Sequence, residues 1–493
     1  MFSLARDYEQ LNLMERVSAL GALPVHKPKK FLQLLNDHID LPTLIPRRFY
    51  DVYYGSETNK RGYRLESMLC ILLLMHFFKF ANVAHMRLTL DFSPQLREFC
   101  QLPEDDCPGD SVLSKFKITF VDELRLFFEA LSLRVMDIFD EYDQTLPDTS
   151  PLKGMNQTLV YDSTGLKPKV KENNPKSLAA ELKRQESYRK VLVKQGKGDN
   201  FNVYHAAFAR MPKYASANAA IRLGYANGHF GYFYKMGIAC NGFGIPLHIH
   251  FLDDDFYANL PIEFATPDDQ KYAFDNASLH PVLSSFYSRI GHRRFHTFMG
   301  DSEFDSYDNY GFLGSLGFEK MLIPINARNA PLSNDPIPRD AENIPCCPRD
   351  TSLQFIPNGS CKGKNRSLRF KYICPKSRFK NGKFTSDCRN MCRDTNSVIT
   401  TYTYPSDDLR TFPGILRGSK QWKTLYKRRT IIEREISSMK SHPALERPNT
   451  YNTASIRADV FLNASVKLIT VMLAFALDKP FYMRNIKNLL LAA

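Results

Sequence analysis

Apolar residues recur at helical spacing through the first 150 residues. The segment 64–86 carries apolar side chains on most faces, and 121–139 repeats them every three or four positions. Between the two, residues 107–111 have the composition of a turn, and Asp110 or Ser111 is expected to cap the helix that follows. The pattern predicts an all-helical region over 1–150.

Beyond a linker near residue 150, short strands alternate with helices. An apolar run at 157–161 predicts a strand that ends on Asp162, and 234–240 with 245–252 predict a β-hairpin. Further along, we expect a helix over 273–290, a strand over 294–299 followed by Gly300-Asp301, a helix over 306–316 and a strand over 320–325. This order predicts an α/β fold with a mixed sheet.

Two segments interrupt the predicted sheet. The first is 167–232, and the second is 327–416, which is rich in Pro, Asn, Arg and Cys and contains short β-like runs. The sheet domain would then comprise 155–326 and 417–480. Its last part holds a basic helix over 419–441 and an apolar helix over 453–477.

Composition narrows the class of protein. The chain has 493 residues, of which 43% are hydrophobic and 12% aromatic, which excludes a disordered chain. The first residues lack the apolar core of a signal peptide. The two most apolar runs, 68–78 and 464–477, are shorter than the roughly 18 to 20 residues that a spanning helix needs. We therefore expect a cytoplasmic protein.

The net charge of +14 favours a polyanionic partner, with nucleic acid ahead of an anionic membrane. Three segments carry the excess, at 167–198, 361–383 and 417–441, with net charges of +7, +9 and +6. The rest of the chain is therefore acidic. If the partner is DNA, these segments are expected to converge on one face. The alternative for the first segment is a solvated helix.

The basic helix carries a carboxylate among cations. Tyr426, Glu433 and Lys440 are spaced by seven residues, so they lie along one face of a helix, and Arg429 precedes Glu433 by four. A solvated helix with ordinary ion pairs would explain the same pattern. Tyr426 has the further alternative of packing against the sheet.

This spacing resembles the Y-R-E-K signature of bacterial insertion-sequence transposases of the DDE superfamily. Residues 160–164 (Val-Tyr-Asp-Ser-Thr) resemble the block that contains the family's first aspartate, and 298–306, around Asp301, resemble the block of the second. Residues 107–116 resemble the end of the helical N-terminal domain in one branch of the family. The resemblance extends over about 47–477.

The resemblance implies a ribonuclease-H-like fold interrupted by insertions. Asp162, Asp301 and Glu433 would be the catalytic residues and would bind two Mg²⁺ ions, with Mn²⁺ as a substitute. Carboxylates are the ligands that these hard ions prefer. The partners would be the element ends and the target DNA, held by a homodimer in the cytoplasm near the nucleoid. The residues implied to contact DNA are Tyr426, Arg429 and Lys440.

Other acidic residues compete for two of these positions. Asp199 and the run Asp253 to Asp255 are alternatives to Asp162, which we prefer because it ends a predicted strand. Asp305 is the alternative to Asp301, but it begins the next predicted helix and is expected to cap it.

Six of the ten cysteines fall between 346 and 392. Four of them could hold a structural Zn²⁺ ion, although the paired C-x2-C spacing of a zinc ribbon is missing. Reduced, packed thiols are the alternative. The candidate ligands are Cys347, Cys374, Cys388 and Cys392.

Two other functions fit the same residues. A metal-dependent nuclease would cut DNA without strand transfer, and an inactive descendant of a transposase would bind DNA without cutting it. The three candidate carboxylates are all present, which favours an active enzyme.

Overall fold

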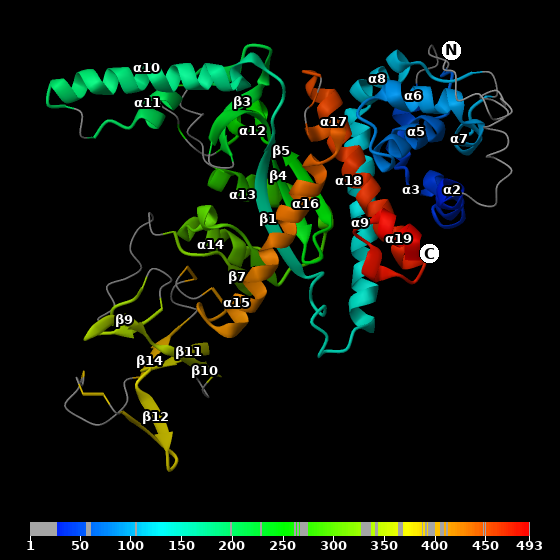
Figure 1. Ribbon diagram of the computed structural model, residues 1–493. Helices are drawn as coiled ribbons and strands as arrows, with labels where there is room; N and C mark the ends of the chain where they lie inside the picture. The colour runs from blue at the N-terminus through cyan, green and yellow to red at the C-terminus, as the bar shows by residue number, and fades with distance from the viewer. Residues whose placement is uncertain are drawn as a thin grey trace, which may run out of the picture.

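The computed structural model describes most of the chain as a mixed α/β protein (Figure 1). The described residues are 27–55, 61–103, 106–197, 200–226, 229–260, 263, 266, 275–326, 337–340, 344–362, 368–386, 388–389, 392, 400–404, 409–410, 413–446, 448 and 450–492.

The described residues before 146 form helices, of which α3, α4 and α8 pack against the long helix α9. The predicted segment 64–86 forms two helices rather than one, because the Asn82 side chain accepts the His85 amide and caps a second helix. The expected cap at Asp110 or Ser111 is also wrong, since the cap residue of α8 is Gly109. The bounds are α2 Lys27–His38, α3 Leu41–Leu44, α4 Arg47–Tyr54, α5 Leu65–Phe77, α6 Val83–Phe92, α7 Pro94–Phe99, α8 Asp110–Thr119 and α9 Val121–Thr145.

A mixed sheet occupies the centre of the molecule. Its strands run in the order β2-β3-β4-β1-β6-β7, and β5 pairs with β4. β1 is antiparallel to β4 and parallel to β6, and β6 is parallel to β7. The predicted hairpin is confirmed as the antiparallel pair β4 and β5. The bounds are β1 Thr158–Leu166, β2 Tyr214–Ala215, β3 Asn218–Ala226, β4 His229–Asn241, β5 Pro246–Phe251, β6 Thr297–Met299 and β7 Lys320–Leu322.

Helices cover both faces of the sheet. On one face, strand side chains such as Val160 share a hydrophobic core with Ile432 and Met439 of α16 and with α9 and α18. On the other face, Leu159 and Tyr161 share a core with α13 and α14. The bounds are α12 Asp254–Ala258, η3 Asp275–Ser278, α13 Leu279–Ile290, η4 Ser302–Phe304, α14 Tyr307–Ser315, α15 Lys420–Tyr426, η5 Lys427–Arg429, α16 Thr430–Lys440, α17 Pro443–Glu446, α18 Thr453–Ala476, η6 Pro480–Tyr482 and α19 Ile486–Ala492.

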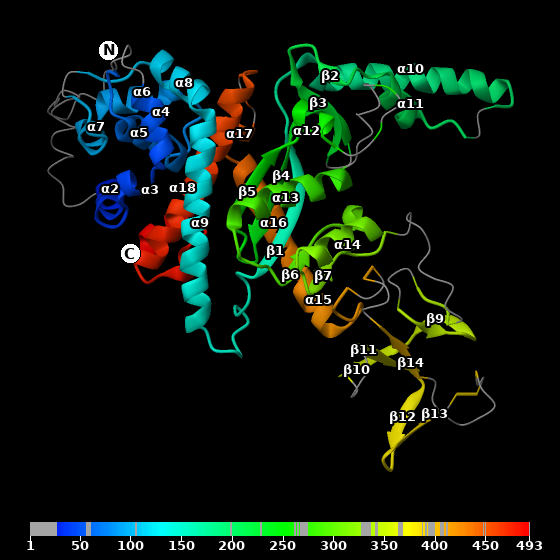
Figure 2. The ribbon, with the colours of Figure 1, turned by 180° about the vertical axis from the view of Figure 1, so that it is seen from behind.

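Two outlying parts project from the side of the sheet that faces away from the N-terminal helices. One carries α10 and α11, and the other is a β-rich part with a small core of its own. They lie at opposite ends of the molecule, with α15 and α16 running between them (Figures 1 and 2). The three basic segments therefore do not converge at one place as expected. The bounds are η1 Lys171–Asn173, α10 Pro175–Lys194, α11 Val203–Arg210, β8 Cys346–Cys347, β9 Asp350–Gln354, β10 Ile356–Lys362, β11 Leu368–Ile373, β12 Ser377–Lys380, β13 Lys383–Ser386 and β14 Thr400–Thr403.

Helix α18 joins the N-terminal helices to the rest of the molecule. It packs against α5, α8, α9 and β5. Among the described residues it is the one helix long and apolar enough to cross a membrane, but 83% of its most apolar window is buried inside the fold. Its apolar character is therefore explained by its central position in the core.

Candidate active site

Asp162 lies in the middle of β1. The expectation that it ends a strand is wrong, because β1 continues to Leu166 through its pairing with β4. The parallel pairing with β6, however, stops at Val160. Side chains alternate along a strand, so the Asp162 carboxylate lies on the face of Val160, which is the face that α16 covers.

Asp301 follows β6 and is brought beside Asp162 by strand register. Val160 of β1 is aligned with Met299 of β6, and each aspartate comes two residues after its aligned residue. Neighbouring parallel strands with this register present equivalent positions on the same face. The backbone amide of Ser302 donates a hydrogen bond to the Asp301 carboxylate.

Glu433 comes from the helix that packs across the same face. The predicted helix over 419–441 contains one turn of 3-10 helix, η5, between α15 and α16. Helix α16 buries Ile432 and Met439 against the sheet, which leaves Glu433 on its flank with 47% of its side chain exposed. Arg429 ends the 3-10 turn and lies between the helix and the strands.

The Arg429 guanidinium contacts all three carboxylates. Its Nη2 lies 2.5 Å from Glu433 Oε1, and its Nη1 lies 3.8 Å from Asp301 Oδ2 and 4.0 Å from Asp162 Oδ2. The arginine side chain is 17% exposed, whereas Asp301 and Glu433 are 44% and 47% exposed, so the carboxylate side of the site is open to solvent. One cation thus offsets the mutual repulsion of three acidic groups that lie far apart in the sequence.

The acid–base properties of the site reflect this crowding. Burial raises the pKa of Asp162 to about 7, and the Asp301 and Asp275 carboxylates add to the rise. The Arg429 charge and the Ser163 amide oppose it. Burial lowers the pKa of Arg429, but the surrounding anionic groups outweigh that effect and keep it above its ordinary value. The crowding thus favours the protonated form of Asp162 and the charged form of Arg429.

Tyr426 and Lys440 flank the carboxylates. The Tyr426 ring stacks on Trp422 at 6.3 Å between centroids, and the Arg429 guanidinium lies 5.8 Å from its centre. Burial raises the pKa of Tyr426 to about 12, so the phenol stays neutral. Burial lowers the pKa of Lys440, and the Asp162 carboxylate opposes that shift. The six predicted site residues therefore lie along the length of α16, from Tyr426 before its first turn to Lys440 at its last residue, and on the strands beside it.

A second layer of polar residues holds β1 in place, and the sequence gives no sign of it. The Ser163 amide donates to Asp162 Oδ1 at 2.8 Å, and the Ser163 hydroxyl donates to Asp275 Oδ2 at 2.5 Å. The Lys235 ammonium, 8% exposed, bonds the other oxygen of Asp275. Asp275 precedes α13, whose position beside β1 depends on tertiary packing, so sequence spacing could not reveal it.

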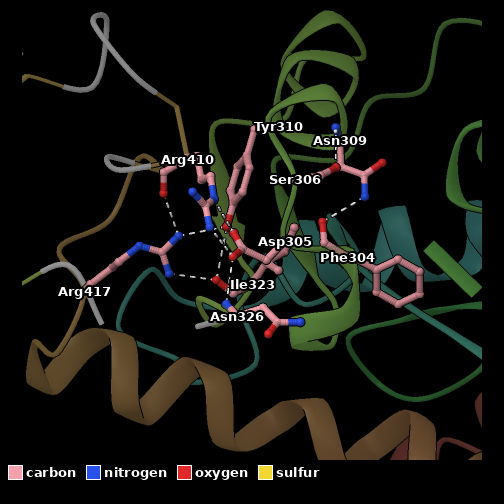
Figure 3. A network of polar contacts seen from close by, with 9 residues as sticks. All are labelled: Phe304, Asp305, Ser306, Asn309, Tyr310, Ile323, Asn326, Arg410 and Arg417. Atoms are coloured by element: carbon pink, nitrogen blue, oxygen red, sulfur yellow. Dashed lines mark hydrogen bonds and ion pairs between the residues drawn. The ribbon is translucent and has the colours of Figure 1, made fainter. Parts of the chain in front are cut away.

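Asp305 has a structural role (Figure 3). It is fully buried and accepts two hydrogen bonds from Arg410, at 3.0 and 2.8 Å, and one from the Asn326 amide at 2.7 Å. The expectation that Asp305 caps the following helix is wrong, because Ser306 is the cap residue and its side chain accepts a hydrogen bond from the Asn309 amide. Asp305 therefore anchors the chain at the start and end of the second insertion.

The competitors for the first aspartate lie elsewhere. Asp253 caps α12 and forms an ion pair with Arg457. Asp255 lies within the same short helix. Asp199 lies outside the described residues.

No group of three or more His, Cys, Asp or Glu side chains in the described part of the chain is arranged to hold a metal ion. At the carboxylates, the Arg429 guanidinium stands among the oxygens. In the β-rich part, Cys347 Sγ and Cys392 Sγ are 3.7 Å apart, and Cys374 packs against the same small core. A zinc ion bound by Cys347, Cys374, Cys388 and Cys392 stays a prediction.

Comparison with known proteins gives one result for the N-terminal helices. Residues 23–118 match a family model described as a transposase domain (DUF772). No curated protein matches the chain. The matched residues are about a fifth of the sequence and end within α8, well before the three carboxylates. The match supports a relation to transposases.

Proposed function

We propose that this protein is a DDE transposase with a ribonuclease-H-like catalytic domain. It would bind the terminal repeats of a mobile element, cleave DNA phosphodiester bonds and transfer the freed 3′-OH to target DNA. The observation that carries the proposal is the meeting of Asp162, Asp301 and Glu433 around one guanidinium. The transposase-domain match is separate support, because it lies in another part of the chain.

The strand order supports the fold assignment. Five strands run β5-β4-β1-β6-β7, the first three antiparallel and the last two parallel to β1. In this order the parallel strands β1 and β6 are neighbours, and each contributes one aspartate. A helix from the far end of the chain contributes the third carboxylate.

The donor set fits divalent magnesium, which prefers carboxylate oxygens. Asp162, Asp301 and Glu433 would hold the ions. When bound, Mg²⁺ supplies activation of the attacking oxygen and neutralises the departing one. The Arg429 side chain must then leave the carboxylates. Its planar fork suits a DNA phosphate, which would replace them as its partner.

The flanking residues fit roles in DNA binding. Lys440, on whose charge the Asp162 carboxylate acts, is a point charge suited to a phosphate oxygen. Tyr426 presents a neutral phenol that can donate a hydrogen bond beside the cleaved end. We further propose that the N-terminal helices bind DNA and that two copies act together on paired ends.

A strand-transfer assay tests the proposal. Full-length protein is incubated with Mg²⁺, a target plasmid and labelled DNA that carries the element's terminal repeats. Joined products support transposition. Nicks without joining indicate a nuclease, and binding without cleavage indicates an inactive descendant; either result would refute the proposed function.

The Glu433→Gln variant tests the site. It should lower cleavage by about 10³-fold or more, because it removes several kcal/mol of charge stabilisation at the reacting oxygens. DNA binding should change little. Glu446→Gln, at an exposed position of α17, is the matched control. Unchanged cleavage by Glu433→Gln would show that the reacting groups lie elsewhere.

A further inference from the structure

Helix α10 projects from the sheet (Figures 1 and 2), and Gln185 is its one buried residue. Its inner face, represented by Leu178, Leu182 and Gln185, is turned to the rest of the fold, and α11 packs against it. The remaining positions are mostly exposed. A helix of twenty residues with so little buried surface contributes little to the hydrophobic core. Packing therefore does not account for the kinds of residue that it exposes.

Four exposed lysines form one stripe on α10. Lys176, Lys183, Lys190 and Lys194 follow one another by seven, seven and four residues. At about 100° per residue these steps keep all four within about 40° of one another, on the side opposite Gln185. At about 1.5 Å per residue the stripe is about 27 Å long.

The acidic residues of α10 are occupied by other partners. Glu181 pairs with Arg184 at 2.7 Å and with Arg210 at 3.5 Å, and Glu186 pairs with Arg189 at 3.5 Å. Among the described residues, no ion pair joins an acidic side chain to any of the four lysines. Like charges four residues apart on a helix repel each other, so the stripe carries a small cost that a polyanion would remove.

The base of the helix is fixed to the catalytic sheet. The Asn173 side chain donates to the Tyr232 carbonyl and accepts the Tyr232 amide, both at 2.9 Å. The Glu172 carboxylate accepts the Ser216 amide at 2.9 Å. Asn174 caps α10 through the Lys176 amide at 3.0 Å. The lysine stripe is therefore held in a defined position relative to Asp162, eleven residues before Asn173 on the same chain.

We propose that the lysine stripe of α10 binds the phosphate backbone of double-stranded DNA outside the cleavage site, without reading its sequence. The proposal rests on the proposed function. A straight row of about 27 Å spans about eight base-pair steps at about 3.4 Å each, and ammonium groups bind phosphates as point charges. Because the stripe lies at the far end of the molecule from the β-rich part, it would extend the DNA contact beyond the active site.

The test is the salt dependence of DNA binding by the full-length protein. Affinity for a random-sequence 40-base-pair duplex is measured by fluorescence anisotropy between about 50 and 200 mM salt. The test variant carries Lys→Gln at positions 176, 183, 190 and 194. The control carries Lys→Arg at the same positions, which keeps the charge.

Each lost phosphate contact reduces the slope of log K against log salt by about 0.9. The glutamine variant should therefore have a slope smaller by about 3 to 4. Between the lowest and the highest salt concentration, the factor by which the glutamine variant loses DNA affinity should be about 100 times smaller than the factor for the unmodified protein. The arginine control should keep the original slope. Matching circular dichroism spectra of the two variants would establish equal folding.

An unchanged slope in the glutamine variant would overturn the proposal, even if the protein cleaves DNA as proposed. Loss of self-association with an unchanged slope would identify a second copy as the partner, and loss of binding to anionic phospholipid vesicles would identify a membrane. Either result would also overturn it. If Glu433→Gln abolishes cleavage while the stripe variant keeps its slope, the stripe proposal alone has failed.

Discussion

The acidic residues around the end of β6 differ in the cation that they contact. Asp162, Asp301 and Glu433 share Arg429, whereas Asp305 is enclosed by Arg410, which lies 105 positions away. Spacing along one helix pointed to Arg429 and Glu433, and the resemblance to a transposase family pointed to Asp162 and Asp301. The sequence favoured Asp301 over Asp305 by giving Asp305 a capping role, but it could not reveal that the partner of Asp305 is Arg410, from the other end of the insertion.

Asp275 provides the prediction for a single residue. Its carboxylate links Ser163, and through it Asp162, to the buried Lys235. Removing an outer partner of a metal ligand lowers metal affinity by about 10- to 100-fold. We therefore expect Asp275→Asn to weaken Mn²⁺ binding by about 10-fold, as measured by calorimetry in the absence of DNA.

The control for this measurement is Asp253→Asn. Asp253 also pairs with an arginine and caps a helix, but it lies outside the site. Its Mn²⁺ affinity should match that of the unmodified protein. Equal affinities in all three proteins would mean that the link through Ser163 does not position Asp162.

At the scale of elements, the local pattern predicted most strands and helices but not their limits. The hairpin β4–β5 and helices α9 and α14 follow from periodicity and turn residues. The end of β1 does not, because β4 extends the pairing to Leu166 after β6 has ended. The 3-10 turn at η5 was also missed, although it sets the position of Arg429 against the strands.

The β4–β5 turn fixes α16 and gives the prediction at this scale. Gly244 has a φ of +75°, and a Cβ placed there would lie 2.2 Å from Ile431 Cγ2. Gly244→Ala therefore imposes both backbone strain and a clash with the helix that carries Glu433. We expect a loss of more than about 1 kcal/mol in the free energy of unfolding, together with weaker Mn²⁺ binding.

Gly196→Ala is the matched substitution for this test. Gly196 has a φ of +70°, but a Cβ there meets no atom within 4 Å. Gly196→Ala should lower the free energy of unfolding by about 1 kcal/mol through backbone strain alone, and it should leave the Mn²⁺ affinity unchanged. Urea denaturation and calorimetry measure the two quantities. If both variants lose the same stability, the contact with Ile431 is not a restraint.

At the scale of the whole molecule, a buried polar cluster joins α5 and α8 to α18. Lys117 Nζ lies 2.6 Å from Asp459 Oδ1, and His76 Nε2 lies 3.3 Å from the same oxygen. The His442 ring stacks on His76 with 4.6 Å between centroids. Burial raises the pKa of Asp459, but the Lys117 charge and the His76 ring outweigh it and keep the pKa below its ordinary value.

The same cluster predicts sensitivity to acid. Burial lowers the pKa of His76, and it lowers that of His442 to about 3. Between about pH 3 and 6.5 the unfolded chain thus binds protons that the folded protein excludes, so the free energy of unfolding falls as the pH drops below about 6.5. One such imidazole accounts for up to about 2 kcal/mol between pH 7 and 5.

Urea unfolding of His442→Gln at pH 7 and pH 5 tests this expectation. The variant should lose about 1 to 2 kcal/mol less than the unmodified protein over that interval. His85→Gln, at an exposed position of α6, serves as the control and should behave like the unmodified protein. An identical pH dependence in all three would show that His442 accepts its proton in the folded state.

The position of α18 has a consequence for synthesis of the chain on the ribosome. Helices α5, α8 and α9 emerge early, but the helix that completes their core ends at Ala476. Until Asp459 has been synthesised, Lys117 and His76 lack their ion-pair partner, and the strand aspartates likewise lack Glu433 beside them. A nascent chain therefore lacks its carboxylate site until Glu433 has been synthesised, and a product that terminates before α18 would expose the apolar surface that this helix covers.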